Sequence, residues 1–166
     1  MKEKSHKKYH DPCVLFLDDC FCNDDLAAAL VAAGFAVQQF TAHFQRAGVD
    51  EKKREQGVKD PKVIALSHRQ GWLILTADRH MRIAHLEDFK KHPNAMVLST
   101  AHHDGNDDIW LKAIISAKLE IERKFKKQLR PWYAQISQAG EITVCETIDC
   151  QAPPKAKGKG NNINLY

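Results

Sequence analysis

The sequence has no apolar stretch long enough to cross a membrane. Its longest apolar run covers only residues 26–33, whereas a membrane-spanning helix needs about 20 apolar residues. The basic residues of positions 1–10 are not followed by the apolar segment that defines a secretory signal. We therefore expect a cytoplasmic protein with no membrane partner.

The sequence also lacks the cysteine pattern of a disulfide-bonded scaffold. Its five cysteines are odd in number and stand at positions 13, 20, 22, 145 and 150, unlike the paired frameworks of small secreted domains. Zinc held by the Cys20-x-Cys22 pair would need a further ligand such as Cys145 or Cys150. Structural zinc sites usually join two tightly spaced pairs, so reduced thiols are the simpler interpretation.

A strongly basic body, typical of a nucleic-acid clamp, is missing as well. The net charge is +4, but residues 1–10 and 151–166 each contribute +3, which leaves about −2 for the rest. The basic ends are expected either to add phosphate affinity that is independent of sequence or to serve only as solubilising tails. The composition therefore divides the chain into a basic segment 1–10, a domain 11–150 and a disordered basic tail 151–166.

Short, continuous apolar runs predict strands of a parallel sheet that is buried on both faces. They alternate with helices that begin at Asn23, at Asp60-Pro61, after Asp78, and at Asn106 or Asp107. We expect the last helix to be one long amphipathic element over residues 107–128. The predicted strands cover residues 13–17, 35–37, 72–76 and 96–98.

The pattern changes after Pro131. Two short alternating stretches, 132–136 and 141–144, flank Ala139-Gly140 and predict a closing hairpin. Because strands and helices alternate before it, we expect an α/β fold of three layers, α/β/α, with a mostly parallel central sheet. The C-terminal hairpin and the tail would be additions to that fold.

Acidic residues follow three of the predicted strands. The carboxyl ends of parallel strands lie at one edge of a sheet, where α/β proteins bind their ligands. We therefore expect these side chains to approach one another there. The residues are Asp18, Asp19, Asp78 and Asp104.

Clustered carboxylates repel one another, and a divalent cation would offset that repulsion. Oxygen ligands without a histidine pair favour Mg²⁺ or Mn²⁺ over zinc, and such sites commonly activate water for attack on phosphorus. Helix capping is the competing interpretation, since Asp60, Asp78 and Asp107 all stand where an N-cap belongs. Spacing alone leaves the two interpretations open.

A resemblance favours the metal site. The order of three motifs is similar to that of PIN-like nuclease domains, especially the compact VapC-type group. The motifs are Leu17-Asp18-Asp19-Cys20, then residues 57–67 with Asp60, then Thr76-Ala77-Asp78. The resemblance covers residues 13–100.

The resemblance implies a metal-dependent endoribonuclease, with Asp18, Asp60 and Asp78 binding Mg²⁺ or Mn²⁺ and Thr76 supporting Asp78. It also implies a toxin of a toxin–antitoxin pair, with RNA as substrate, an antitoxin protein as partner, and a homodimer. Asp19 stands where the family has Glu, and Cys20 where it has Asn. The candidate for the fourth acid is Asp104, with Asp107 next.

Other residues have a functional and a plain interpretation. Arg79 and His80 would contact the scissile phosphate, or simply occupy a first helical turn. His102-His103 and the basic side of residues 107–128 would bind metal or RNA, or be solvated surface. Two other functions remain open: a PIN-like binding module that has lost its metal, and a phospho-receiver domain.

Overall fold

The protein is built around one six-stranded sheet. The computed structural model describes residues 12–21, 23–44, 60–78, 81–100 and 107–145. The strand order is β2-β1-β3-β4-β5-β6, with β1 to β5 parallel and β6 antiparallel to β5. The strands are β1 (Val14–Leu17), β2 (Ala36–Gln39), β3 (Leu73–Thr76), β4 (Met96–Thr100), β5 (Trp132–Ile136) and β6 (Ile142–Cys145).

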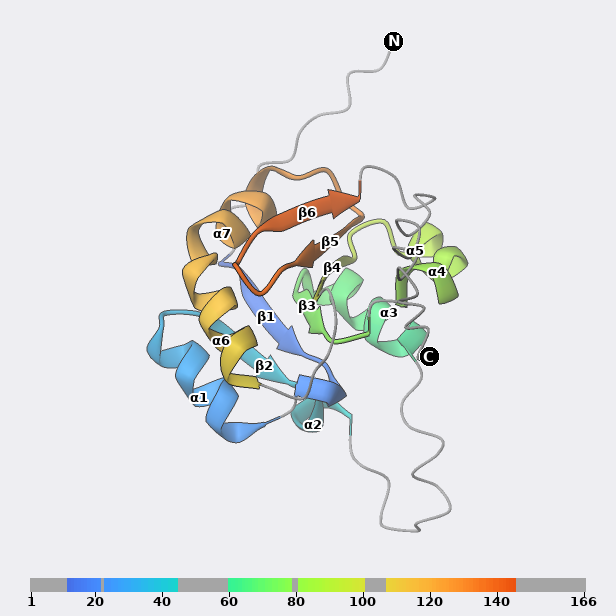
Figure 1. The fold of residues 1–166 in the computed structure, drawn as a ribbon. Coiled ribbons are helices and arrows are strands. Elements are labelled where there is room, and N and C mark those ends of the chain that lie inside the picture. The colour runs from blue at the N-terminus through green and yellow to red at the C-terminus, as the bar shows by residue number, and fades with distance from the viewer. Residues whose placement is uncertain (1–11, 22, 45–59, 79–80, 101–106, 146–166) are drawn as a thin grey trace, which may run out of the picture.

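Helices cover both faces of the sheet and give the expected three layers (Figure 1). One face packs against α1 (Asp24–Ala32), α6 (Asp107–Ser116) and α7 (Lys118–Lys127). The other packs against α2 (Phe40–His43), α3 (Asp60–Gln70), α4 (Met81–Ala84) and α5 (Leu86–Lys91). Alternate strand residues point to opposite faces, so Leu15 and Leu17 join the first core and Phe16 joins the second.

Helix α1 begins where the sequence predicts, directly after Asn23. The Asn23 side chain accepts hydrogen bonds from the backbone N–H groups of Asp25 and Leu26, at 2.9 and 3.3 Å. A short 3₁₀ turn, η1 (Asp19–Phe21), joins β1 to this cap. The chain therefore turns within a few residues of Asp18, which fixes that residue at the end of β1.

The expected single helix over residues 107–128 is wrong in one respect, because it is divided at Ala117 into α6 and α7. The Ser116 hydroxyl donates to the Ala113 carbonyl at 2.8 Å, a local bond that bends helices. The predicted apolar positions are nevertheless all buried. They are Trp110, Ile114, Ala117, Ile121 and Phe125.

The helix expected between Asp78 and Lys91 is also divided. It forms α4 and α5, and His85 between them has a non-helical backbone, with φ −128° and ψ 35°. The predicted C-terminal hairpin is confirmed as β5 and β6. No helix in the described part of the chain is long and apolar enough to span a membrane, and segments 1–10 and 151–166 lie outside that part.

Candidate functional site

The candidate site lies at the point where the strand order of the parallel sheet reverses. From β1 the chain goes to β2 on one side, and β3 then pairs with β1 on the other side. α/β sheets bind ligands at the carboxyl ends of the two strands that flank such a point. Asp18 follows β1 and Asp78 follows β3 by two residues, so topology brings both to this position.

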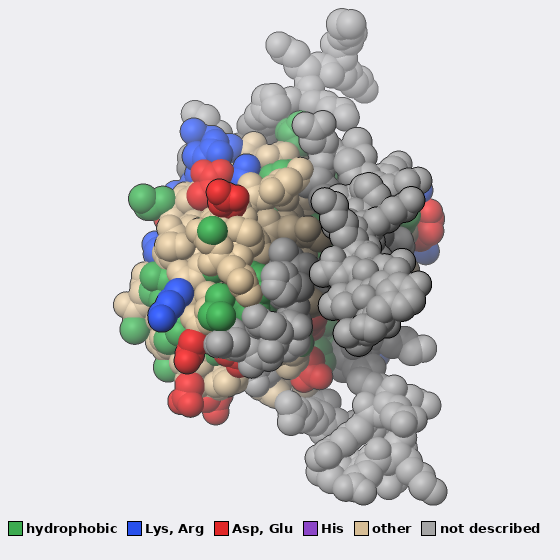
Figure 2. Space-filling model, in the orientation of Figure 1, with side chains coloured by type: hydrophobic (Ala, Val, Ile, Leu, Met, Phe, Trp, Pro, Cys, Tyr) green, Lys and Arg blue, Asp and Glu red, His purple; other side chains and the backbone are tan. Residues whose placement is uncertain are grey.

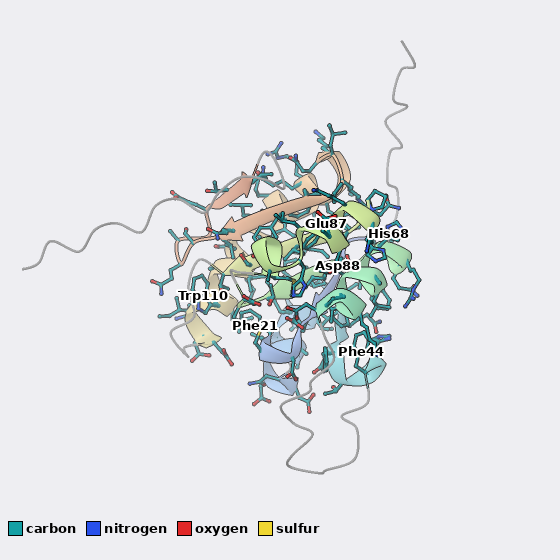
Figure 3. All side chains as sticks on the ribbon, turned by 90° about the vertical axis from the view of Figure 1, so that its right-hand side faces the viewer. Phe21, Phe44, His68, Glu87, Asp88 and Trp110 are labelled. Atoms are coloured by element: carbon teal, nitrogen blue, oxygen red, sulfur yellow. The ribbon has the colours of Figure 1, made fainter. Side chains whose placement is uncertain are left out.

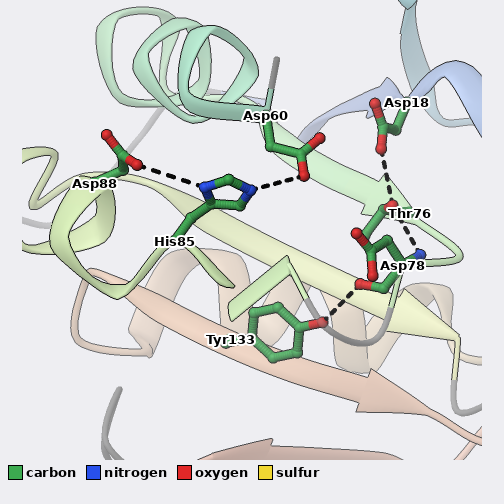
Figure 4. Close-up of polar contacts among 7 residues, drawn as sticks. All are labelled: Asp18, Asp60, Thr76, Asp78, His85, Asp88 and Tyr133. Carbon is green, nitrogen blue, oxygen red and sulfur yellow. Dashed lines mark hydrogen bonds and ion pairs between the residues drawn. The ribbon is translucent and has the colours of Figure 1, made fainter. Parts of the chain in front are cut away.

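A chain of hydrogen bonds joins these two aspartates through Thr76 (Figure 4). The Thr76 hydroxyl donates to Asp18 Oδ2 at 2.8 Å, and the backbone N–H of Asp78 donates to Thr76 Oγ1 at 3.1 Å. Thr76 is fully buried. Its hydroxyl group therefore contacts both aspartates, whereas the resemblance implied support of Asp78 alone.

The Asp18 carboxyl is buried, with 8% of the residue exposed. Burial raises its pKa above the usual 3.8, while hydrogen bonds from Thr76 and from the Asp19 backbone oppose the rise. The negative charges of Asp60 and Asp19 raise the pKa further. The site therefore concentrates negative charge around a carboxyl group that has lost much of its hydration.

Asp60, the first residue of α3, faces the same region. Its hydrogen-bond partner is His85, a residue that the sequence did not suggest. His85 Nε2 lies 3.0 Å from Asp60 Oδ2, and His85 Nδ1 lies 3.6 Å from Asp88 Oδ2 (Figure 4). Figure 3 looks onto this layer of α3, α4 and α5, with Asp88 labelled. A histidine 25 residues after Asp60 carries no spacing signal, so only the fold reveals the pair.

The hairpin strand β5 also reaches the site. The Tyr133 hydroxyl donates to the backbone carbonyl of Asp78 at 3.1 Å. In β4, Ser99 pairs in register with Thr76 and is fully buried, and its hydroxyl has no hydrogen-bond partner in the described part of the chain. Neither residue was predicted, because each is placed by strand register rather than by a motif.

The remaining candidates differ in where they fall. Asp19 is exposed beside Asp18. Cys20 Sγ accepts a hydrogen bond from the Ala77 N–H at 3.1 Å and lies 3.6 Å from Thr76 Oγ1, and burial of its thiol raises its pKa. Asp107 begins α6. The candidates outside the described residues are Asp104, Arg79, His80, His102 and His103.

The donor chemistry of the site suits a hard divalent cation. Asp18, Asp60 and Asp78 offer carboxylate oxygens, which Mg²⁺ and Mn²⁺ prefer. A cation would offset the burial and the neighbouring negative charges that raise the Asp18 pKa. Within the described residues, no three His, Cys, Asp or Glu side chains are arranged to hold a metal ion as they stand. The oxygen atoms of these residues thus suit the cation chemically, whereas their positions in the structure do not yet form a three-ligand site. Their roles as ligands stay a prediction.

Comparison with known proteins identifies the family. A family model described as a PIN-like domain matches residues 13–98, which is just over half of the chain. The protein therefore belongs to the PIN-like domain family, whose members are generally nucleases. No curated protein and no solved structure matches the chain. The match supports the resemblance at family level and leaves the VapC-type subgroup as an expectation.

Proposed function

We propose that the protein is a metal-dependent endoribonuclease that hydrolyses RNA phosphodiester bonds. The observation that carries the proposal is the chain Asp18–Thr76–Asp78 at the switch point of a PIN-like sheet, with the charge of Asp60 acting on Asp18. Because the chain matches a PIN-like family model, a phospho-receiver function has no support.

Each site residue has a distinct part in the proposal. Asp18, Asp60 and Asp78 would hold Mg²⁺ or Mn²⁺, with Asp19 and Asp104 as further candidate ligands. The bound cation would activate water and stabilise charge on the phosphoryl group. Thr76 holds the Asp18 carboxylate by donating to Oδ2, and a carboxylate has further lone pairs that can bind a cation. Tyr133 fixes the backbone at Asp78.

A toxin role, an antitoxin partner and a homodimer belong to the same proposal, and the resemblance to VapC-type chains supports them. The carboxyl edge is acidic, and an RNA nuclease that lacks a basic clamp needs another source of phosphate affinity. The basic segments 1–10 and 151–166 would provide it. Growth arrest on expression of the wild-type chain, relieved by Asp18→Asn, would support the toxin role.

The central test is RNA cleavage by purified protein with EDTA, Mg²⁺ or Mn²⁺. We expect cleavage with metal only, and a loss of about 100-fold or more in Asp18→Asn and Asp78→Asn, because a metal ligand contributes several kcal/mol to transition-state stabilisation. Asp25→Asn is the matched control, since Asp25 is an exposed first-turn residue of α1. Its activity should equal that of the wild type.

One observation favours a second candidate, a binding module without metal. Asp60 is engaged by His85, and no three-ligand group exists among the residues that the structure describes. Folded protein that cleaves no RNA with either metal, yet retains RNA affinity in EDTA, would replace the nuclease by this module.

A further inference from the structure

The contact between Asp60 and His85 joins two parts of the chain that the family motifs do not connect. Asp60 begins α3, whereas His85 lies in the break between α4 and α5. Nε2 and Oδ2 are 3.0 Å apart, and the two side chains are only 25% and 31% exposed. A carboxylate oxygen can only accept, so the ring nitrogen is the donor.

Asp88 holds the opposite side of the ring. Its Oδ2 lies 3.6 Å from His85 Nδ1, three residues along in α5, and its side chain is 28% exposed. With a carboxylate at each nitrogen, the imidazole has a defined orientation. Asp88, His85 and Asp60 thus form one line of side chains that ends at the candidate metal site (Figure 4).

We propose that His85 is a positioning residue for Asp60, which orients the Asp60 carboxylate toward the divalent cation. The inference rests on the proposed metal-dependent function. The bond to Nε2 uses Oδ2 and leaves Oδ1 of Asp60 available as a ligand. Residues that hydrogen-bond a metal ligand in this way commonly raise metal affinity 10- to 100-fold.

A purely structural role is the competing explanation: His85 would connect α5 to α3 and stabilise the fold. Experiment can separate the two roles. A residue that only connects helices changes the melting temperature when it is removed, but folded protein then binds metal as before. A positioning residue changes metal affinity in protein that is fully folded.

The test measures Mn²⁺ binding directly, by electron paramagnetic resonance of free Mn²⁺ added to metal-stripped protein at one fixed pH. We expect His85→Ala to weaken Mn²⁺ binding about 10-fold or more. Asp88→Asn should weaken it less, because the ring remains. His85→Gln should retain part of the affinity, because its amide can donate to Asp60. His92→Ala removes a partly exposed imidazole just after α5 and is the matched control.

The outcomes separate this inference from the proposed function. Wild-type affinity, or tighter binding, in folded His85→Ala would overturn the positioning role while leaving the metal site in place. Absence of Mn²⁺ binding by the wild type would overturn the metal-dependent function and the inference with it. If circular dichroism shows that His85→Ala is unfolded, His85→Gln and Asp88→Asn decide, and unchanged affinity in both would reject the inference.

Discussion

Asp18 is the residue in which burial and function oppose each other most directly. Its carboxyl is nearly enclosed by the end of β1 and by Thr76, and the loss of hydration disfavours its charged form. Nearby acids increase that penalty. An isolated buried carboxylate of this kind destabilises the fold at neutral pH, whereas a ligand for a cation needs it charged.

Asp18→Asn should therefore stabilise the metal-free protein at neutral pH. Because the folded pKa is raised above the usual 3.8, the folded state binds the proton more tightly, and stability falls as pH rises from that value through the folded pKa. Asn removes the charge and still accepts from Thr76. In EDTA we expect a melting temperature higher by about 2–4 °C for each kcal/mol recovered.

The same measurement at pH 3 is the control. There the wild-type carboxyl is mostly protonated in both states, so the difference between Asp18→Asn and the wild type should shrink. A variant that melts below the wild type at neutral pH in EDTA would contradict the argument that burial penalises the charged Asp18.

The β5–β6 hairpin is an element that lies beyond the residues matched by the family model, yet it is built into the domain. Its turn donates from the Gly140 N–H to the Ser137 carbonyl at 2.9 Å. Gly140 has φ +82°, and a Cβ there would lie 2.5 Å from Ser116 Oγ and 3.2 Å from the Ala113 carbonyl. The turn is thus seated against the end of α6, where that helix bends.

Gly140→Ala should destabilise the protein by roughly 2–4 kcal/mol, combining backbone strain with steric overlap. Gly34→Ala is the matched control, because Gly34 also has positive φ, at +92°, but its Cβ would meet only the flexible Lys118 side chain, at 3.4 Å. Urea unfolding measures both. Equal losses in the two variants would show that the α6 contact contributes nothing.

On the sheet face covered by α1, α6 and α7, acidic and basic helix ends lie at opposite edges of the sheet. The acids of α1 and α6 lie at the helix starts, beside the carboxyl edge of the sheet, whereas Lys124, Lys126 and Lys127 lie in the last turn of α7. β5 runs parallel to β4, so α7 must end at the opposite edge before β5 begins. Figure 2 shows acidic side chains at the lower end, over α1 and α6, and basic ones with a few acidic ones among them at the upper end, over α7.

Lys126→Glu/Lys127→Glu should therefore change the RNA cleavage rate less than about threefold at 0.1 M salt. The strands of four or five residues separate the two edges by roughly 15 Å, beyond the screening length of about 10 Å. Cleavage of a short single-stranded RNA measures the effect. A tenfold loss in folded protein would instead show that the basic side of α7 binds the RNA.

Much of the fold was predictable because it depends on local patterns. Apolar runs located β1 to β4, and Asn23 and Asp60 located two helix starts. The breaks at His85 and Ala117 were missed, because the apolar period continues through both positions. A tertiary contact from His85 to Asp60 accompanies the first break, and a local hydrogen bond from Ser116 to Ala113 accompanies the second.

By itself, the sequence determined which acids follow strands and therefore that Asp18 and Asp78 lie at one edge of a parallel sheet. Only the tertiary structure decided their surroundings: the Thr76 hydroxyl between them, Tyr133 on the Asp78 backbone, and His85 on Asp60. The position of each strand along the chain follows from local apolar runs, whereas the order of the strands in the sheet is given by the tertiary structure. Contacts between residues 25 to 58 positions apart depend on register and helix packing, which no local pattern encodes.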